Sequence, residues 1–350
     1  MGAQGSSGVP AEREANELAE KLDKACNDND LESFKKLWEV SNFHRLRRRD
    51  EHLARSAVAG QGGANDFGMD LQLLGREGNS GVVRHIKYAL RHMSADWREE
   101  GIRAAASFLH LEEGRKMLAK IDFTAAIPLI TMEDDHGGDR GEDEEDEEEE
   151  EPVARRKARD PKELEQARKH AERTKLAADV LYEMSGHKLF ADKMCDIAIL
   201  NFLGVSLNQV PECAESVTGA FDRLSGQQHL FRLSEASVGD VLESYIKTVH
   251  CGRPPAGYSM VNWKRDVRAL GNCASTLGTF FKHGYHLQVE TETVIKVFDT
   301  VGVPQVAEDA ADNLRLLAEI ARLFYWMCRM SETGITDRLY EEAQYRVADP

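Results

Sequence analysis

The sequence lacks any uncharged apolar run long enough to cross a bilayer, and its first residues lack the basic, apolar and small-residue order of a signal peptide. The strict apolar–polar alternation of β-strands is also absent. The cysteines form no Cys-x-x-Cys pair, and four of them lie in apolar helical patterns, which favours reduced, buried thiols over disulfides or a metal site. These absences together indicate a cytoplasmic, all-helical chain. The cysteines are Cys26, Cys195, Cys213, Cys251, Cys273 and Cys328.

The sequence also lacks a catalytic constellation. His283 and His286, with His250-Cys251, have the side-chain types of a metal site, but a glycine lies between the two histidines and no carboxylate pattern supports them. The glycines from Gly271 to Gly278 are not followed by the Lys-Ser/Thr pair of a phosphate-binding loop. We therefore expect a non-enzymatic protein with no catalytic residues, no metal and no cofactor.

Acidic residues are concentrated in one stretch. Of the net charge of −16, residues 133–151 carry −13, from 14 acids and the single base Arg140, so the rest of the chain carries −3. The unbroken run Glu142–Glu151 repels itself and buries nothing, so we expect a disordered loop inserted between helices. Its simple interpretation is solubility and spacing. The alternative is an electrostatic arm that competes for a basic surface or attracts a basic partner. A nearly neutral remainder argues against nucleic-acid binding.

The N-terminus carries a pattern for lipid attachment. Gly2 followed by Ser6 fits N-myristoylation, in which the glycine receives an acyl chain after Met1 is removed. The run Gly5–Gly8 also resembles a flexible linker, so both interpretations stay open. A single myristoyl chain binds membranes weakly, and the basic cluster at residues 45–49 is either a second membrane signal or a solvated helix face. The pattern predicts at most a weak peripheral association with a membrane.

Apolar residues recur at three- to four-residue spacing through most of the chain, which is typical of amphipathic helices. Gly101–Thr131 shows the pattern best. Its small residues allow close helix packing, Glu112–Lys120 forms a charged helix, and Ala125–Ile130 opens a third apolar segment. None of these helices can bury its apolar side alone, so each must stack on a neighbour, as in repeat solenoids.

Capping residues predict where several helices begin and end. Asp30 is placed to cap one helix, and Asp160-Pro161 to begin another that ends at Gly186. The apolar run Ala191–Gly204 predicts one helix that is buried on more than one side. The expected parts are a flexible N-terminus at 1–9, N-terminal helices at 10–60, repeats at 66–132, the acidic and basic insertion at 133–160, and repeats at 161–347.

Several of these segments resemble the armadillo/HEAT class of α-solenoids, with the armadillo form closer. Armadillo repeats carry a run like Ala-Leu-x-Asn-Leu-Ala on their third helix and often begin the next unit with Gly-Ala-Ile-Pro-x-Leu. Ala269–Ser275 and Ala198–Gly204 match the first run, and Ala126–Ile130 matches the second. The resemblance covers residues 66–347, in roughly four to six units. It implies a right-handed superhelix of stacked helical repeats.

The resemblance also implies a binding groove. In the family the third helix lines a concave groove, and its Asn binds the backbone of an extended peptide through the donor and acceptor of its amide. At the matching positions this chain has Asn272 and Asn201, with Ser107 and Arg322 at two degenerate copies. The alternative is that either Asn ties a loop carbonyl within its own repeat. The tryptophan that nuclear-import receptors place one helical turn before the Asn is missing, so such a receptor is not expected.

These observations predict a protein-binding adaptor or scaffold that holds another protein in the concave groove. Two other functions stay open. One is a co-chaperone that clamps a chaperone's nucleotide-binding domain and accelerates nucleotide exchange, as some short armadillo proteins do. The other is an enzyme on a helical scaffold, which a deep polar pocket or a bound metal would favour. An architecture of this kind serves many unrelated roles, so the resemblance alone does not identify the partner.

Overall fold

The computed structural model of the chain describes residues 8–40, 81–109, 112–131, 161–226, 229–249, 259–285, 293 and 310–330. Every regular element in these ranges is a helix, with 14 α-helices and two 3-10 helices. The all-helical expectation is thus confirmed for this part of the chain. The acidic stretch at 133–151 and the acylation signal at Gly2 lie outside the described residues.

The N-terminal helices are separated from the rest by the gap that precedes residue 161. They are α1 (Gly8–Asn27), α2 (Leu31–Val40), α5 (Gly81–Leu90), α6 (Ala95–Ala106), α7 (Glu112–Lys120), α8 (Phe123–Ala126) and the 3-10 helix η1 (Pro128–Thr131).

The remaining helices follow that gap. They are α9 (Pro161–Ser185), α10 (Lys188–Met194), α11 (Ile197–Gln209), the 3-10 helix η2 (Pro211–Cys213), α12 (Ala214–Gly226), α13 (Leu230–Glu235), α14 (Val238–Thr248), α15 (Met260–His283) and α17 (Ala310–Met330).

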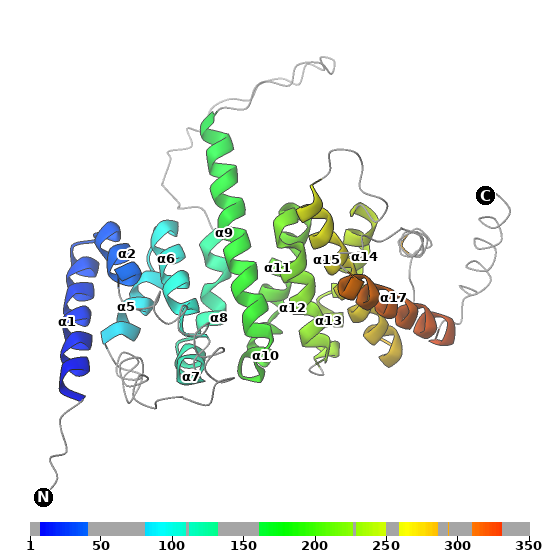
Figure 1. The fold of residues 1–350 in the computed structure, drawn as a ribbon, viewed down its shortest axis with the longest axis horizontal. Coiled ribbons are helices and arrows are strands. Elements are labelled where there is room, and N and C mark those ends of the chain that lie inside the picture. The colour runs from blue at the N-terminus through cyan, green and yellow to red at the C-terminus, as the bar shows by residue number, and fades with distance from the viewer. Residues whose placement is uncertain are drawn as a thin grey trace, which may run out of the picture.

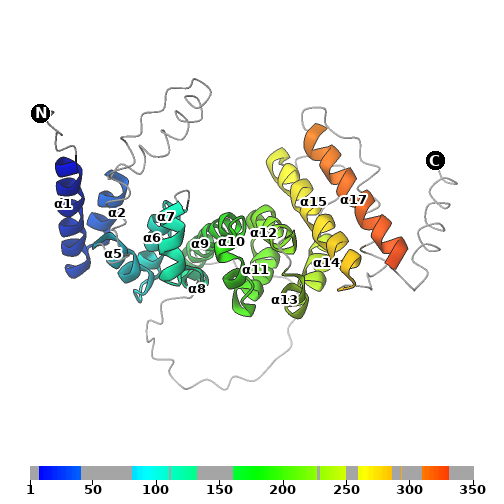
Figure 2. The same cartoon turned by 90° about the horizontal axis from the view of Figure 1, so that it is seen from below.

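The helices lie in chain order along the long axis of the molecule, with α1 at one end and α17 toward the other (Figure 1). Most contacts join near neighbours in the chain: α1 packs on α2 and α5, α9 on α12, α12 on α15, and α15 on α17. The row bends, and Figure 2 shows α1 and α17 rising on the same side of its middle. Each helix therefore buries its apolar face mainly against the helices before and after it.

Aromatic rings fill the space between the N-terminal helices. Phe34 on α2 lies 5.0 Å from the Trp97 ring on α6, between ring centres, and Trp38 lies 6.3 Å from Phe108. Tyr88 on α5 meets the edge of Trp97 at 5.6 Å. Rings of this size bury large apolar areas, and edge-on contacts add to that gain. This aromatic cluster joins α2, α5 and α6.

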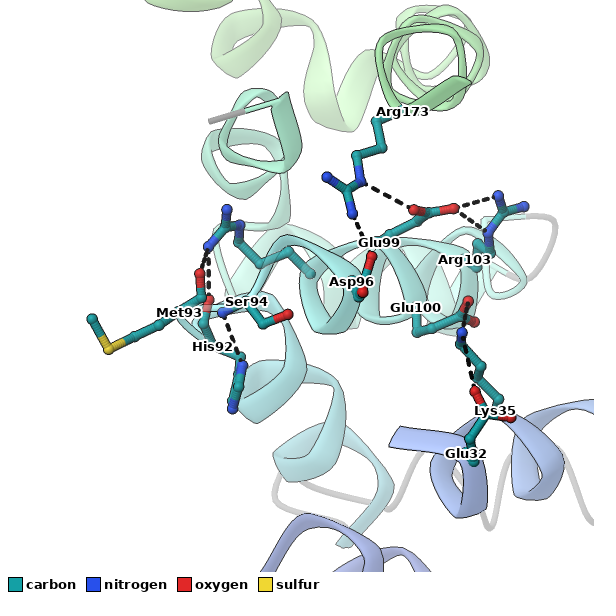
Figure 3. A network of polar contacts seen from close by, with 11 residues as sticks. Glu32, Lys35, His92, Met93, Ser94, Asp96, Glu99, Glu100, Arg103 and Arg173 are labelled. Carbon is teal, nitrogen blue, oxygen red and sulfur yellow. Dashed lines mark hydrogen bonds and ion pairs between the residues drawn. The ribbon is translucent and has the colours of Figure 1, made fainter. Parts of the chain in front are cut away.

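A chain of charges connects the N-terminal helices to α9 (Figure 3). Glu99 on α6 accepts hydrogen bonds from Arg103 Nη2 at 2.7 Å and from Arg173 Nε on α9 at 3.2 Å. Arg173 also pairs with Asp96. On the other side of α6, Lys35 of α2 lies 3.9 Å from Glu100. Because Arg173 is only 17% exposed, these bonds are less screened than ordinary surface pairs.

Small residues let α15 and α17 pack closely. Gly271 and Gly278 lie two turns apart on the side of α15 that faces Leu316 and Leu323. A Cβ at Gly278 would lie 3.5 Å from the Leu323 Cα, so the two backbones approach within side-chain distance. Leu316 and Leu323 are buried in this contact, at 3% and 2% exposure.

Several predicted boundaries agree with the structure. Asp30 accepts a hydrogen bond from the Ser33 N–H at 3.0 Å and so caps α2. Helix α9 begins at Pro161 and ends just before Gly186, and α7 spans the predicted Glu112–Lys120. The prediction of a single helix over Ala191–Gly204 was wrong.

Two helices replace that single one, because Asp196 interrupts it. Its carboxylate accepts from the Ala198 N–H at 2.9 Å and begins α11. The apolar periodicity runs on across the break, so spacing alone did not reveal it.

Within the described residues, no helix has both the length and the apolar composition that crossing a membrane requires.

Candidate protein-binding surfaces

One polar face runs across α12, α15 and α17. On α15 its residues are Arg268, Asn272 and Ser275, which helical spacing places on one side of the helix. We call the inner face the set Glu215 and Asp222 of α12, these three residues of α15, and Arg315 and Arg322 of α17. Asn272 and Arg322, two of the four residues predicted for a groove, both belong to it.

Asn272 lies in the floor of the inner face and is only 7% exposed. Its Nδ2 donates to Thr218 Oγ1 of α12 at 3.3 Å, and its Oδ1 accepts from Arg315 Nη2 of α17 at 3.2 Å. Both ends of the amide thus bind side chains of neighbouring helices. This role resembles the alternative interpretation, in which the Asn stabilises the protein's own fold and does not bind a partner. Asn272 therefore positions the Arg315 guanidinium.

Arg315 shows which way the row of helices bends. The same Nη2 that binds Asn272 lies 3.5 Å from Asp222 Oδ2 of α12, so this side chain on α17 crosses α15. A side chain can reach past one helix to the next only where the three curve toward one another. The inner face is therefore on the inside of the bend seen in Figure 2.

Arginines recur every second turn along α17, at positions 315, 322 and 329. Arg322 Nη2 donates to Ser275 Oγ at 2.9 Å, and the same guanidinium pairs with Glu319. Arg329 Nη1 donates to the Tyr325 hydroxyl at 2.7 Å. The side chains of Arg315 and Arg322 remain 59% and 49% exposed, so each guanidinium keeps donors toward solvent. A seven-residue repeat on a helix gives a row of cations spaced about 10 Å apart.

A pocket with a volume of about 560 Å³ lies among helices that Figure 2 shows on the outer side of the bend. One wall comes from α8 and η1 and the other from α11, and α13 adds Arg232. We call it the outer pocket. Its walls are mostly apolar, through Ala125, Pro128, Leu129, Ile199, Phe202 and Val205.

Asn201, another predicted groove residue, is exposed on α11 and lines the outer pocket. The structure thus separates it from Asn272. Ser107, the fourth, lies at the C-terminal end of α6, where its Oγ donates to the Ala104 carbonyl at 2.6 Å. The four predicted residues therefore do not form one site: two share the inner face, one lines the outer pocket, and Ser107 closes a helix.

Four cysteines lie buried among the helices, namely Cys26, Cys195, Cys213 and Cys273. Burial raises the pKa of Cys26 and of Cys195 to about 11, and that of Cys213 to about 12. A thiol with so high a pKa is almost wholly protonated near neutral pH, and the protonated form is a poor nucleophile. These thiols act as small apolar side chains in the core.

Sequence reasoning missed two residues that shape these surfaces. The first is Arg315, which links α17 to α12 across α15. The seven-residue spacing of the arginines over 315–329 was a sequence signal that could have identified it. Thr124 is the other: it is 1% exposed, and its hydroxyl has no hydrogen-bond partner in the described part of the chain. No sequence pattern marks an unsatisfied hydroxyl.

Comparison with known proteins gives no relative from which the role of these surfaces could be inferred. No family model matches the chain, and no curated protein and no solved structure matches it either.

Proposed function

We propose that this protein is a non-enzymatic adaptor, built as an armadillo-like α-solenoid, whose inner face binds an extended, carboxylate-bearing segment of another protein. The observation that carries the proposal is the row of arginines at 315, 322 and 329 along α17, of which Arg315 and Arg322 belong to the inner face. Guanidinium groups bind carboxylates through two parallel hydrogen bonds.

Helix order supports the solenoid part of the proposal. The helices α10, α11 and α12 form a short–long–long unit, and α13, α14 and α15 form another in the same order. The last helix of each unit lies next to the last helix of the following one, since α12 packs on α15. Repeats that contact only their neighbours are the defining property of solenoids.

The spacing of the arginines favours a particular ligand conformation. A polyproline II segment has three residues per turn, so every third side chain lies on one face, about 9 Å from the last. This repeat nearly matches the distance of about 10 Å between successive arginines. Carboxylates at every third position would thus meet Arg315, Arg322 and Arg329 in turn. Since Arg315 and Arg322 are 59% and 49% exposed, a ligand can reach the donors that each guanidinium keeps toward solvent.

The test is fluorescence anisotropy with a labelled peptide of Asp-Pro-Ala repeats, compared with a peptide of the same composition whose aspartates are contiguous. We expect the spaced peptide to bind, and the double variant Arg322→Ala/Arg329→Ala to raise its Kd about ten-fold. Arg103→Ala/Arg168→Ala is the control, since it removes the same charge from exposed arginines elsewhere. Equal losses in both double variants, or no preference for the spaced peptide, would contradict the proposal.

The location of the adaptor is part of the same proposal. We place it in the cytoplasm, with a weak membrane tether wherever Gly2 is acylated, because one myristoyl chain alone binds membranes reversibly. Mass spectrometry of the N-terminal peptide from eukaryotic cells tests the tether. An unmodified Gly2 or a retained Met1 removes it from the proposal.

A further inference from the structure

The outer pocket has features that the proposed function does not use. Helix α11 packs on α12, while its residues Asn201 and Val205 are exposed and line the outer pocket. The pocket's volume of about 560 Å³ falls within the range of ligand sites. Val205 is 52% exposed and Leu129 is 38% exposed, so apolar surface on both walls meets solvent.

Thr124 supplies an unsatisfied donor in the wall of this pocket. Threonines inside the longer helices bond back to a carbonyl four residues earlier: Thr174 to His170 at 2.8 Å, and Thr218 to Ala214 at 2.7 Å. Thr124 is the second residue of the four-residue helix α8, and the residue four positions earlier, Lys120, belongs to the preceding helix α7. The buried hydroxyl of Thr124 therefore lacks a partner that a ligand can provide.

The walls favour a helical ligand over an extended one. An extended segment needs partners for many backbone N–H and C=O groups. Of the polar groups on the walls, Thr124 and Asn201 can offer a hydroxyl and an amide. An α-helix bonds its own backbone and presents an apolar stripe, which suits two apolar walls.

Charged residues in the lining of the pocket indicate which charge the ligand should carry. Lys193 is already engaged, because its Nζ donates to the Ala119 carbonyl at 2.6 Å and lies 3.2 Å from Asp122. Asp192 and Asp196 are exposed, Asp196 while also capping α11, and Arg232 is the second cation that lines the pocket. After Thr131 the chain continues Met132-Glu133-Asp134-Asp135, whose acidic residues are repelled by carboxylates such as Asp192 and Asp196.

We infer that the outer pocket binds a short amphipathic helix of a partner protein, with two apolar side chains one turn apart and a neighbouring Lys or Arg. The apolar pair occupies the space between Leu129 and Val205. The basic residue pairs with Asp192 or Asp196, and a polar side chain of the helix satisfies Thr124. The adaptor thus holds two different segments at two separate surfaces.

The experiment selects ligands from a random library of 16-residue displayed peptides on the purified full-length chain. We expect the selected sequences to share the apolar pair and the basic residue. Val205→Arg places a charge in the pocket and should weaken their binding at least ten-fold. Val261→Arg is the matched control, because Val261 is 76% exposed on α15, outside the pocket. It should leave the Kd unchanged.

Two further variants separate the named contacts from a general apolar surface. Asp192→Lys, at an exposed position, should weaken the selected peptides several-fold, and Thr124→Val, which keeps side-chain volume, should weaken those with a polar residue at the matching position. Selection of acidic peptides, or equal binding to Val205→Arg and Val261→Arg, would overturn the inference. So would a dimer of the wild-type chain that Val205→Arg dissolves in sedimentation, because the occupant would then be a second copy.

Discussion

The N-terminal helices and the inner layer of α12, α15 and α17 are held together in opposite ways. Large rings fill the space between α2, α5 and α6, with Trp97 touching Phe34 on one side and Tyr88 on the other. Between α15 and α17, Gly271 and Gly278 remove side chains so that the helices nearly touch. The first arrangement depends on large side chains, whereas the second leaves room for a small one. The two regions should therefore respond differently to the removal and to the addition of side-chain atoms.

Removing a ring should produce the largest effect. Phe108 is fully buried and packs against Trp38, so Phe108→Ala leaves a cavity and should lower the free energy of unfolding by about 3–5 kcal/mol. Urea unfolding followed by circular dichroism measures the loss. Phe231→Ala, at a residue that is 60% exposed, should change stability by less than about 0.5 kcal/mol. Similar losses in the two variants would show that the rings are not the main support.

Adding one methyl group to a helical glycine should have opposite signs in the two regions. A Cβ at Gly101 would lie 2.9 Å from the Ala89 Cβ and 3.0 Å from the Leu90 nitrogen, so Gly101→Ala should destabilise by about 1–3 kcal/mol. A Cβ at Gly278 meets only ordinary contacts at 3.5 Å, and Ala favours helices over Gly by up to about 1 kcal/mol. Gly278→Ala should therefore be neutral or stabilising. Thermal unfolding of both variants measures the two effects. A loss of stability in both variants would contradict the predicted difference between the two regions.

Truncating a buried amide should cost more than truncating an exposed one. Asn272→Ala removes the partner of Thr218 and of Arg315 and should lower the free energy of unfolding by about 1–3 kcal/mol. Asn201→Ala, on the exposed side of α11, should change it by less than about 0.5 kcal/mol. Any loss of ligand binding in Asn272→Ala should therefore appear together with a lower urea midpoint. Loss of binding at full stability would instead show that its amide contacts the ligand directly.

The smallest expected effect is on the pH dependence of stability. We expect His85, in the N-terminal helices, to contribute most to it. Burial lowers the pKa of His85, whose Nε2 lies 2.8 Å from Asp23 Oδ1. The unfolded chain thus binds more protons as the pH falls past the ordinary histidine value of about 6.5, so stability should decline below about pH 7. The hydrogen bond with His85 lowers the pKa of Asp23, so that contribution is lost only at more acidic pH.

Comparing urea midpoints at pH 7.5 and 5.5 isolates the histidine effect. We expect a smaller difference in His85→Gln than in the wild type. Burial also lowers the pKa of the less buried His187, so His187→Gln should flatten the profile to a lesser degree. Identical profiles in His85→Gln and the wild type would contradict the assignment.

The sequence predicted what depends on neighbouring residues and missed what depends on distant ones. The charged helix at Glu112–Lys120 and the cap at Asp30 follow from local spacing and chemistry. The break at Asp196 was also local, but a continuous apolar pattern outweighed a single capping residue. The six-residue helix α13 is too short for periodicity to show.

The roles of the candidate site residues could not be predicted in the same way. Arg315 acquires its role from Asn272 and Asp222, which lie 43 and 93 residues away along the chain. Asn272 is buried because α17 covers it, and a repeat motif does not specify which helix will do so. The resemblance therefore named two positions that lie in the inner face, Asn272 and Arg322, without stating which side chains stay accessible.

The reach of Arg315 across three helices makes the curvature of the molecule adjustable. Its contact with Asp222 joins α17 to α12 across α15, which packs on both. We expect that raising the salt concentration, or offering the guanidinium another carboxylate, loosens this contact and lets α17 move away from α12. A ligand that binds there would then also set the distance between the two ends of the rod, and anything held at either end would move with it.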